Sequence, residues 1–201
     1  MTNANYKKSR RAWNMNVRSV MLIGCLTAFL MIPRSYAQTA VDKSTSCNKN
    51  NTKTMEVKDY TTSILVDQSP QEVFNAINNV RGWWQGEITG STDKLNDEFT
   101  YRAGDIHYSK QKIVDLIPNK RVEWLVTESK LNFVPHKDEW TSTKIIFDIS
   151  KEGDKTKLTF THHGLVPTFE CYDGCSGAWE KLVEKSLFSL ITTGKGMNVL
   201  F

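Results

Sequence analysis

The sequence lacks the motifs that mark the commonest catalytic classes. It contains no Gly-x-Ser-x-Gly motif, and no cysteine stands in a recognisable protease context. It has neither a phosphate-binding loop nor a dinucleotide-binding glycine fingerprint. No apolar run reaches the ~20 residues that a comfortable membrane span needs. These absences favour a protein that holds a ligand over an enzyme.

An excess of charge is also missing once the N-terminus is set aside. The whole chain carries a formal net charge of +4, but residues 1–37 hold six basic residues and no acid. The remaining chain therefore has a net charge of −2. Such a body gives no electrostatic reason to expect nucleic-acid binding.

The N-terminus has the three regions of an export signal. Arg18 precedes an apolar run from Val20 to Ile32, and small residues at Ser35 and Ala37 predict cleavage before Gln38. This pattern predicts a signal-peptide-like segment over residues 1–37 and a periplasmic or secreted protein. The alternative is a wrongly extended start, in which Met55 opens a cytoplasmic protein. Residues 38–58 are polar and read as a flexible linker, so the folded domain spans 59–201.

The last helix is the most informative segment of the domain. From Cys175 to Thr193 the apolar residues recur with a period near 3.6, after about 100 residues of strand-like alternation. Gly194 suits the position after the helix. The expected apolar stripe consists of Trp179, Leu182, Val183, Leu187 and Leu190. A helix of this kind after antiparallel strands buries its stripe on the sheet, and space between the two is the best functional candidate.

The remaining pattern predicts one strand, two short helices and six further strands before that helix. Ser69 and Glu72 form a capping box around Pro70, which predicts the first helix. Strands are expected at 60–66, 87–89, 98–103, 106–115, 121–127, 143–150 and 155–162. The connection from Ser129 to Trp140 is the longest within the sheet, and it either covers the mouth of a cavity or lies passively on the surface.

Strand alternation indicates which side chains face the helix. Three strands place apolar residues on one face: Val122, Trp124 and Val126, then Ile145, Phe147 and Ile149, then Leu158 and Phe160 with His162. In the strand at 106–115 the parity is ambiguous, because Tyr108 faces one way and His107 the other. These faces belong either to a solid core or to the lining of a cavity, and His162 is either a core histidine or a polar contact.

Two residue pairs invite sharper hypotheses. Cys171 and Cys175 precede the last helix, where they either pack as small apolar residues, form a disulfide after export, or join His162 and His163 in a zinc site. The spacing is unusual for zinc, so no metal and no cofactor are expected. Trp83 and Trp84 either anchor a partner or pack beneath the last helix.

Residues 60–196 resemble the START-like (SRPBCC) superfamily, which includes the birch-pollen-allergen fold and polyketide cyclases. Within it, the chain is most similar to the branch named for activator of heat-shock protein 90 ATPase homologues. The resemblance is carried by 66–74, 81–84, 170–175 and 190–196. It implies an α+β helix-grip fold, with a curved antiparallel sheet of about seven strands and the long C-terminal helix on its concave face.

This resemblance implies a cavity that binds a small apolar or amphipathic ligand without catalysis. The expected ligand-binding residues are Trp84, Tyr108, Trp124, Phe147, Phe160, His162, Trp179, Val183 and Leu187. Two alternatives remain open. The family name implies a chaperone partner and a role as an ATPase co-activator, and the fold also supports a cavity enzyme of the cyclase, hydratase or lyase type. For such an enzyme, His162 and Tyr108 are the candidate proton-transfer pair.

Overall fold

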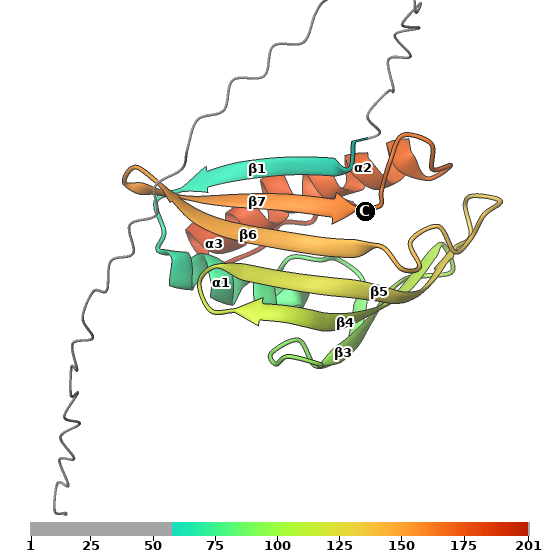
Figure 1. Cartoon of the computed structure of the whole chain (residues 1–201), viewed down its shortest axis with the longest axis horizontal. Helices are drawn as coiled ribbons and strands as arrows, with labels where there is room; N and C mark the ends of the chain where they lie inside the picture. The colour runs from blue at the N-terminus through green and yellow to red at the C-terminus, as the bar shows by residue number, and fades with distance from the viewer. Residues whose placement is uncertain (1–57, 201) are drawn as a thin grey trace, which may run out of the picture. The chain divides into compact units, whose positions relative to one another are not determined.

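Seven antiparallel strands form a single sheet in residues 58–200, the part of the chain that the computed structural model describes (Figure 1). Their order across the sheet is β1-β7-β6-β5-β4-β3-β2. The strands are β1 (Tyr60–Val66), β2 (Glu87–Gly90), β3 (Glu98–Ala103), β4 (His107–Ile117), β5 (Arg121–Leu131), β6 (Lys144–Glu152) and β7 (Lys155–His163). The predicted signal segment and the alternative start at Met55 lie outside the described residues, as does nearly all of the predicted linker.

The helices lie on one face of this sheet (Figure 1). After β1 come α1 (Pro70–Asn78) and the 3-10 turn η1 (Val80–Gly82). After β7, three consecutive helical segments form one long helical rod: α2 (Tyr172–Lys181), η2 (Leu182–Leu187) and α3 (Phe188–Thr193). The expected helix-grip α+β fold is confirmed. Within the described residues, no helix combines the length and the apolar character that crossing a membrane requires.

The alternation expected for the three central strands is confirmed. Every residue expected on the inner face of β5, β6 and β7 is buried, with exposed fractions from 0 to 7%. Burial of such side chains, at ~1.5–3 kcal/mol each, is what offsets the entropy of ordering the chain. These side chains form the core between the sheet and the helical rod.

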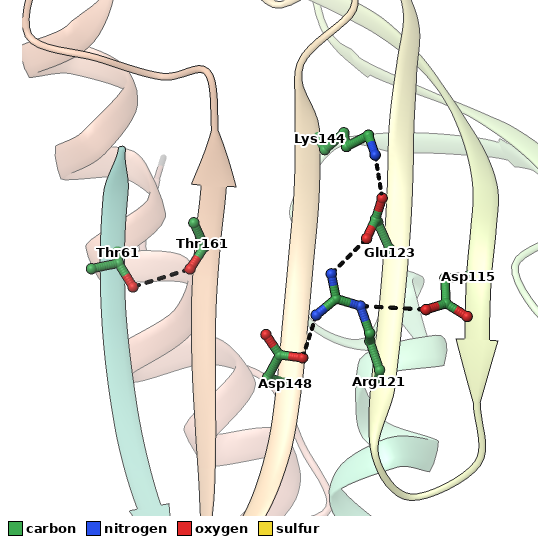
Figure 2. A network of polar contacts seen from close by, with 7 residues as sticks. All are labelled: Thr61, Asp115, Arg121, Glu123, Lys144, Asp148 and Thr161. Carbon is green, nitrogen blue, oxygen red and sulfur yellow. Dashed lines mark hydrogen bonds and ion pairs between the residues drawn. The ribbon is translucent and has the colours of Figure 1, made fainter. Parts of the chain in front are cut away.

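The outer face of the same strands carries a network of charges around Arg121 (Figure 2). Its guanidinium group contacts Glu123 and Asp148 at 2.6 Å each and Asp115 at 3.4 Å. Lys144 contacts the other Glu123 oxygen at 2.8 Å. Burial raises the pKa of Glu123, but hydrogen bonds from Lys144 and Arg121 outweigh burial and hold that pKa below its usual value. The network joins β4, β5 and β6 on the side away from the helices.

The start of α1 is the capping box that the sequence predicts. The Glu72 amide donates to the Ser69 hydroxyl oxygen at 3.3 Å, and the Ser69 amide donates to the Glu72 carboxylate at 2.8 Å. We expect Ser69→Ala to lower the free energy of unfolding by about 1 kcal/mol, because the Glu72 amide in the first turn loses the hydroxyl oxygen that accepts its hydrogen bond. Urea denaturation measures this, with Ser63→Ala on the exposed side of β1 as the control. Equal stability of the two variants would contradict the role of the cap.

The helical rod contains a π-helical turn at η2, which the sequence pattern did not predict. Buried positions recur every four residues along the rod, at Cys175, Trp179, Val183, Leu187 and Ile191. In an α-helix of 3.6 residues per turn, such a repeat drifts around the axis. A π turn holds more residues, so η2 reverses the drift and keeps one face on the sheet. The expected stripe is therefore incomplete at its end: Leu190 is partly buried and packs against the core, and Ile191, which was not predicted, is the more buried of the two.

Candidate ligand pocket

An apolar pocket of about 290 Å³ lies between the first turns of α2 and the connections at one end of the sheet. This volume is at the lower end of the ~300–1,000 Å³ typical of small-molecule sites. The pocket is lined by Trp84, Tyr101, Ala103, Ile106, His107, Phe133, Trp140, Gly174, Cys175, Ala178, Trp179, Leu182 and Leu200.

Three indole rings form the inner wall of the pocket. Trp140 and Trp179 stack at 5.7 Å between ring centroids, and Trp84 lies 5.0 Å from Trp179. Trp84 also stacks on Tyr101 at 4.4 Å. All three tryptophans are at most 3% exposed, so each ring is held by the core behind it. This wall is therefore set by core packing.

The connection between β5 and β6 supplies the outer wall. Its Asn132 amide donates to the Ile106 carbonyl at 2.8 Å, which joins this connection to the turn between β3 and β4. The Glu139 carboxylate accepts the amides of Glu170 at 2.7 Å and Cys171 at 2.9 Å, where α2 begins. Phe133 is 48% exposed at the mouth of the pocket. This connection contributes Phe133 and Trp140 to the lining of the pocket, and a role as a cover stays a prediction.

The segment after α3 returns to the pocket and contributes Leu200. Gln85 holds this segment through its side-chain amide, which donates to the Met197 carbonyl and accepts the amides of Val199 and Leu200 at 2.9 Å each. The buried Ser186 hydroxyl in η2 accepts the Met197 amide at 3.1 Å. The segment that carries Leu200 is therefore held by hydrogen bonds from Gln85, between η1 and β2, and from η2.

His107 is the one imidazole among the described residues that line the pocket. Its ring lies edge-to-face between Tyr101, at 5.0 Å, and Trp140, at 4.6 Å. Burial in these aromatic surroundings lowers the pKa of His107 to about 4, so the imidazole is neutral at pH 7. Its Nε2 atom is buried and has no hydrogen-bond partner in the described part of the chain.

Comparison with models of protein families shows which family this chain belongs to. Residues 67–191, more than half of the chain, match the model of the family described as Activator of Hsp90 ATPase homolog 1-like protein. The chain belongs to this family. The match includes α1, all strands except β1 and most of the helical rod, so the Hsp90-activator-homologue family assignment rests on the domain that contains the pocket.

Solved structures agree with this assignment at the level of the fold. The solution structure of the Aha1 dimer from Colwellia psychrerythraea matches with a TM-score of 0.56 and 24% identity, over 69% of this chain and 99% of that one. Protein MLL2253 from Mesorhizobium loti gives 0.53 and 14% identity, over 68% and 99%. Mll3558 from Rhizobium loti gives 0.52 and 18%, over 67% and 96%. A comparison with curated protein sequences found no match to this chain.

This Hsp90-activator-homologue domain places the predicted site residues in three environments. Trp84 and Trp179 line the pocket. His162 lies in the core just behind the pocket wall, and Tyr108 lies on the outer face of β4, where the Arg102 guanidinium stands 5.0 Å from its ring centroid. The other five are fully buried in the core outside the pocket lining: Trp124, Phe147, Phe160, Val183 and Leu187. Ligand contact by the predicted set stays a prediction.

His162 is a structural histidine with both ring nitrogens occupied. The Trp179 indole N–H donates to His162 Nδ1 at 2.9 Å, so the imidazole proton is on Nε2 and faces the Thr143 hydroxyl oxygen at 2.9 Å. Thr143 in turn donates to the Trp140 carbonyl at 2.5 Å. Burial lowers the pKa of His162 to about 3. The proposed proton-transfer pair is therefore not assembled, because Tyr108 lies on the opposite face of the sheet.

The pocket residue that the sequence left undecided is His107. In the β3–β4 pairing, Ala103 stands opposite His107 and Tyr101 stands opposite Ser109, which places His107 on the inner face. This parity is hard to read from the sequence because two buried residues that continue the same face, Ser109 and Gln111, are polar. A short turn joins β3 to β4. If the alternation of β3 had been followed across this turn, it could have shown which face His107 occupies. Nothing periodic in the sequence marks Leu200 or Phe133.

The remaining hypotheses concern the cysteines and the Trp83–Trp84 pair. Cys171 and Cys175 are buried free thiols, and a hydrogen bond to Cys175, together with burial, raises the pKa of Cys171. His163 is exposed and contacts Asp59 at 2.7 Å, so His162 and His163 do not converge on the cysteines. Within residues 58–200 no cluster of three potential metal ligands is found. Trp83 and Trp84 are 1% and 2% exposed, which confirms packing over surface anchoring.

Proposed function

We propose that this domain binds a small, mainly apolar ligand in the pocket between α2 and the connections at the end of the sheet. The observation that carries the proposal is a preformed apolar cavity with aromatic walls and one neutral imidazole. Concave, mostly apolar sites with few polar groups are the usual form of small-molecule sites. Export of the protein, with cleavage near Ala37, remains part of this proposal and would make the domain an extracytoplasmic carrier.

The proposal is for binding without chemistry. General acid–base catalysis is most efficient when the catalytic group has a pKa near the working pH. The pKa of His107 is about 4, and His162 is occupied by Trp179 and Thr143 behind the wall. Burial also raises the pKa of Tyr101 in the lining, further from neutrality.

A substitution that fills the pocket tests this proposal. Ala178 lines the pocket from the first turns of α2, and Ala178→Phe places a ring in the cavity. We expect titration of the full chain with a library of small aromatic and aliphatic molecules to perturb the amide NMR signals of Ile106, Phe133 and Leu200. These perturbations should disappear in Ala178→Phe.

The matched control is Glu180→Phe, which adds the same ring at an exposed position of the same helix. It should bind as the unmodified protein does. An absence of perturbation by every library member, or equal binding by Ala178→Phe, would remove the proposal.

The family match favours a second candidate, activation of a chaperone ATPase. The family is named for this activity, and the match spans the domain's helices and most of its strands. An ATPase assay with Hsp90 and excess protein tests it directly. Stimulation that is equal for the unmodified protein and Ala178→Phe would separate the activity from the pocket, and no stimulation would exclude it.

A further inference from the structure

The walls of the pocket have no formal charge. None of the described lining residues is Lys, Arg, Asp or Glu. An ionised ligand would lose its hydration shell on entry and would meet no counter-ion. The pocket is therefore poorly suited to carboxylates, including the anions of fatty acids.

The His107 imidazole is one of the polar groups of the lining, together with the Tyr101 hydroxyl, the Trp140 indole N–H and the Cys175 thiol. Its Nε2 atom is buried without a partner in the described residues, although buried polar atoms are nearly always paired. The rings of Tyr101 and Trp140 hold the imidazole at the cavity edge. The burial that lowers the pKa of His107 also keeps it uncharged at neutral pH, so it offers no cation to an acid.

A neutral imidazole has one donor nitrogen and one acceptor nitrogen. A hydroxyl group both donates and accepts, so it can pair with the ring in either tautomer. We propose that the pocket selects uncharged, mainly apolar molecules with a hydroxyl group, which pairs with the His107 imidazole, over carboxylic acids of the same size. This inference rests on the proposed function and adds the chemical class of the ligand.

Three probes that share one ring system test the selection: naphthalene, 2-naphthol and 2-naphthoate. Calorimetric titration of the full chain at neutral pH should give binding of 2-naphthol about tenfold tighter than of 2-naphthoate. It should also be several-fold tighter than binding of naphthalene. The ¹⁵N signals of the His107 ring should move with 2-naphthol and stay in place with naphthalene, a response that packing alone would not give.

Two variants of β4 separate the imidazole from its surroundings. His107→Leu should still bind naphthalene and should lose the preference for 2-naphthol. Tyr108→Phe removes a hydroxyl from the neighbouring residue on the outer face and should leave all three affinities unchanged. The ring signals are read on the unmodified protein, so the inference is tested even if His107→Leu fails to fold.

The outcomes distinguish this inference from the proposal beneath it. If none of the three probes binds, both the proposed ligand pocket and the proposed selection are overturned for ligands of this size. Binding of 2-naphthoate as tightly as 2-naphthol would overturn the selection and leave a ligand pocket. A preference for 2-naphthol that survives in His107→Leu, or a His107 ring that does not respond, would overturn the role of the imidazole.

Discussion

Replacement of Trp179 by alanine is expected to lower the free energy of unfolding by about 4–5 kcal/mol. Removal of a fully buried tryptophan costs ~3–5 kcal/mol through lost transfer energy and the cavity left behind. Trp179 is 1% exposed and contacts the rings of Trp84, Trp140 and Phe160. It also donates the hydrogen bond to His162 Nδ1, and loss of this donor leaves a buried acceptor unpaired. The upper end of the range is therefore expected.

Chemical denaturation of Trp179→Ala measures this effect against the unmodified protein. A domain of ordinary stability, about 5–15 kcal/mol, retains little after such a loss, so Trp179→Phe provides a milder second variant. Phe188→Ala on the same helical rod is the control, because Phe188 is 37% exposed and should cost under about 1 kcal/mol. A loss below about 1 kcal/mol for Trp179→Ala would mean that the helix face is wrongly assigned.

Acidification is expected to destabilise the domain well above the pH at which carboxylates titrate. The pKa is about 3 for His162 and about 4 for His107 in the folded state, against ~6.5 in an unfolded chain. Below pH 6.5 the unfolded state therefore binds protons that the folded state excludes. Each histidine lowers the free energy of unfolding by about 1.4 kcal/mol per pH unit, until the pH reaches its folded pKa. The effect is absent above about pH 7 and totals about 5 kcal/mol at pH 4.5.

Urea denaturation at a series of pH values between 7 and 4.5 measures this slope. His162→Gln has no imidazole to protonate at this position, so its slope should be about half that of the unmodified protein. The exposed pair of His136 and Glu170, 2.6 Å apart, raises the pKa of His136 and acts in the opposite direction. His136→Gln is the control and should leave the slope as steep or make it steeper. An equal slope in His162→Gln would show that His162 is not buried in its neutral form.

The core was more predictable from the sequence than the pocket, for a physical reason. Strands β5 to β7 have one fully buried face, so the alternation of their side chains follows burial directly. The same reasoning left β4 undecided because its inner face carries polar side chains such as Ser109 and Gln111, and it missed Ile191 because η2 changes the helical period. The sequence also missed the extension of β5 to Leu131.

The pocket draws on segments that have no repeating pattern. Phe133 and Trp140 come from a connection, and Leu200 comes from the segment after the last helix. These segments are held by a few side-chain hydrogen bonds to residues distant in the sequence, such as those of Glu139 and Gln85. No local propensity encodes such contacts. The expected ligand-binding set therefore shares only Trp84 and Trp179 with the lining, and the connection from Ser129 to Trp140, considered as a possible cover, contributes Phe133 and Trp140.

The contacts between the indole rings have an optical consequence. Trp83, Trp84, Trp124, Trp179 and Trp140 form one continuous chain of neighbours, with ring centroids 5.0 to 6.4 Å apart. At such separations excitation energy passes between chromophores before emission, so these five indoles fluoresce as one coupled unit. A molecule that quenches Trp140 in the wall of the pocket would also lower the emission of the indoles deeper in the core. The domain thus contains its own optical reporter, in which occupancy of one cavity changes the light from the entire aromatic core.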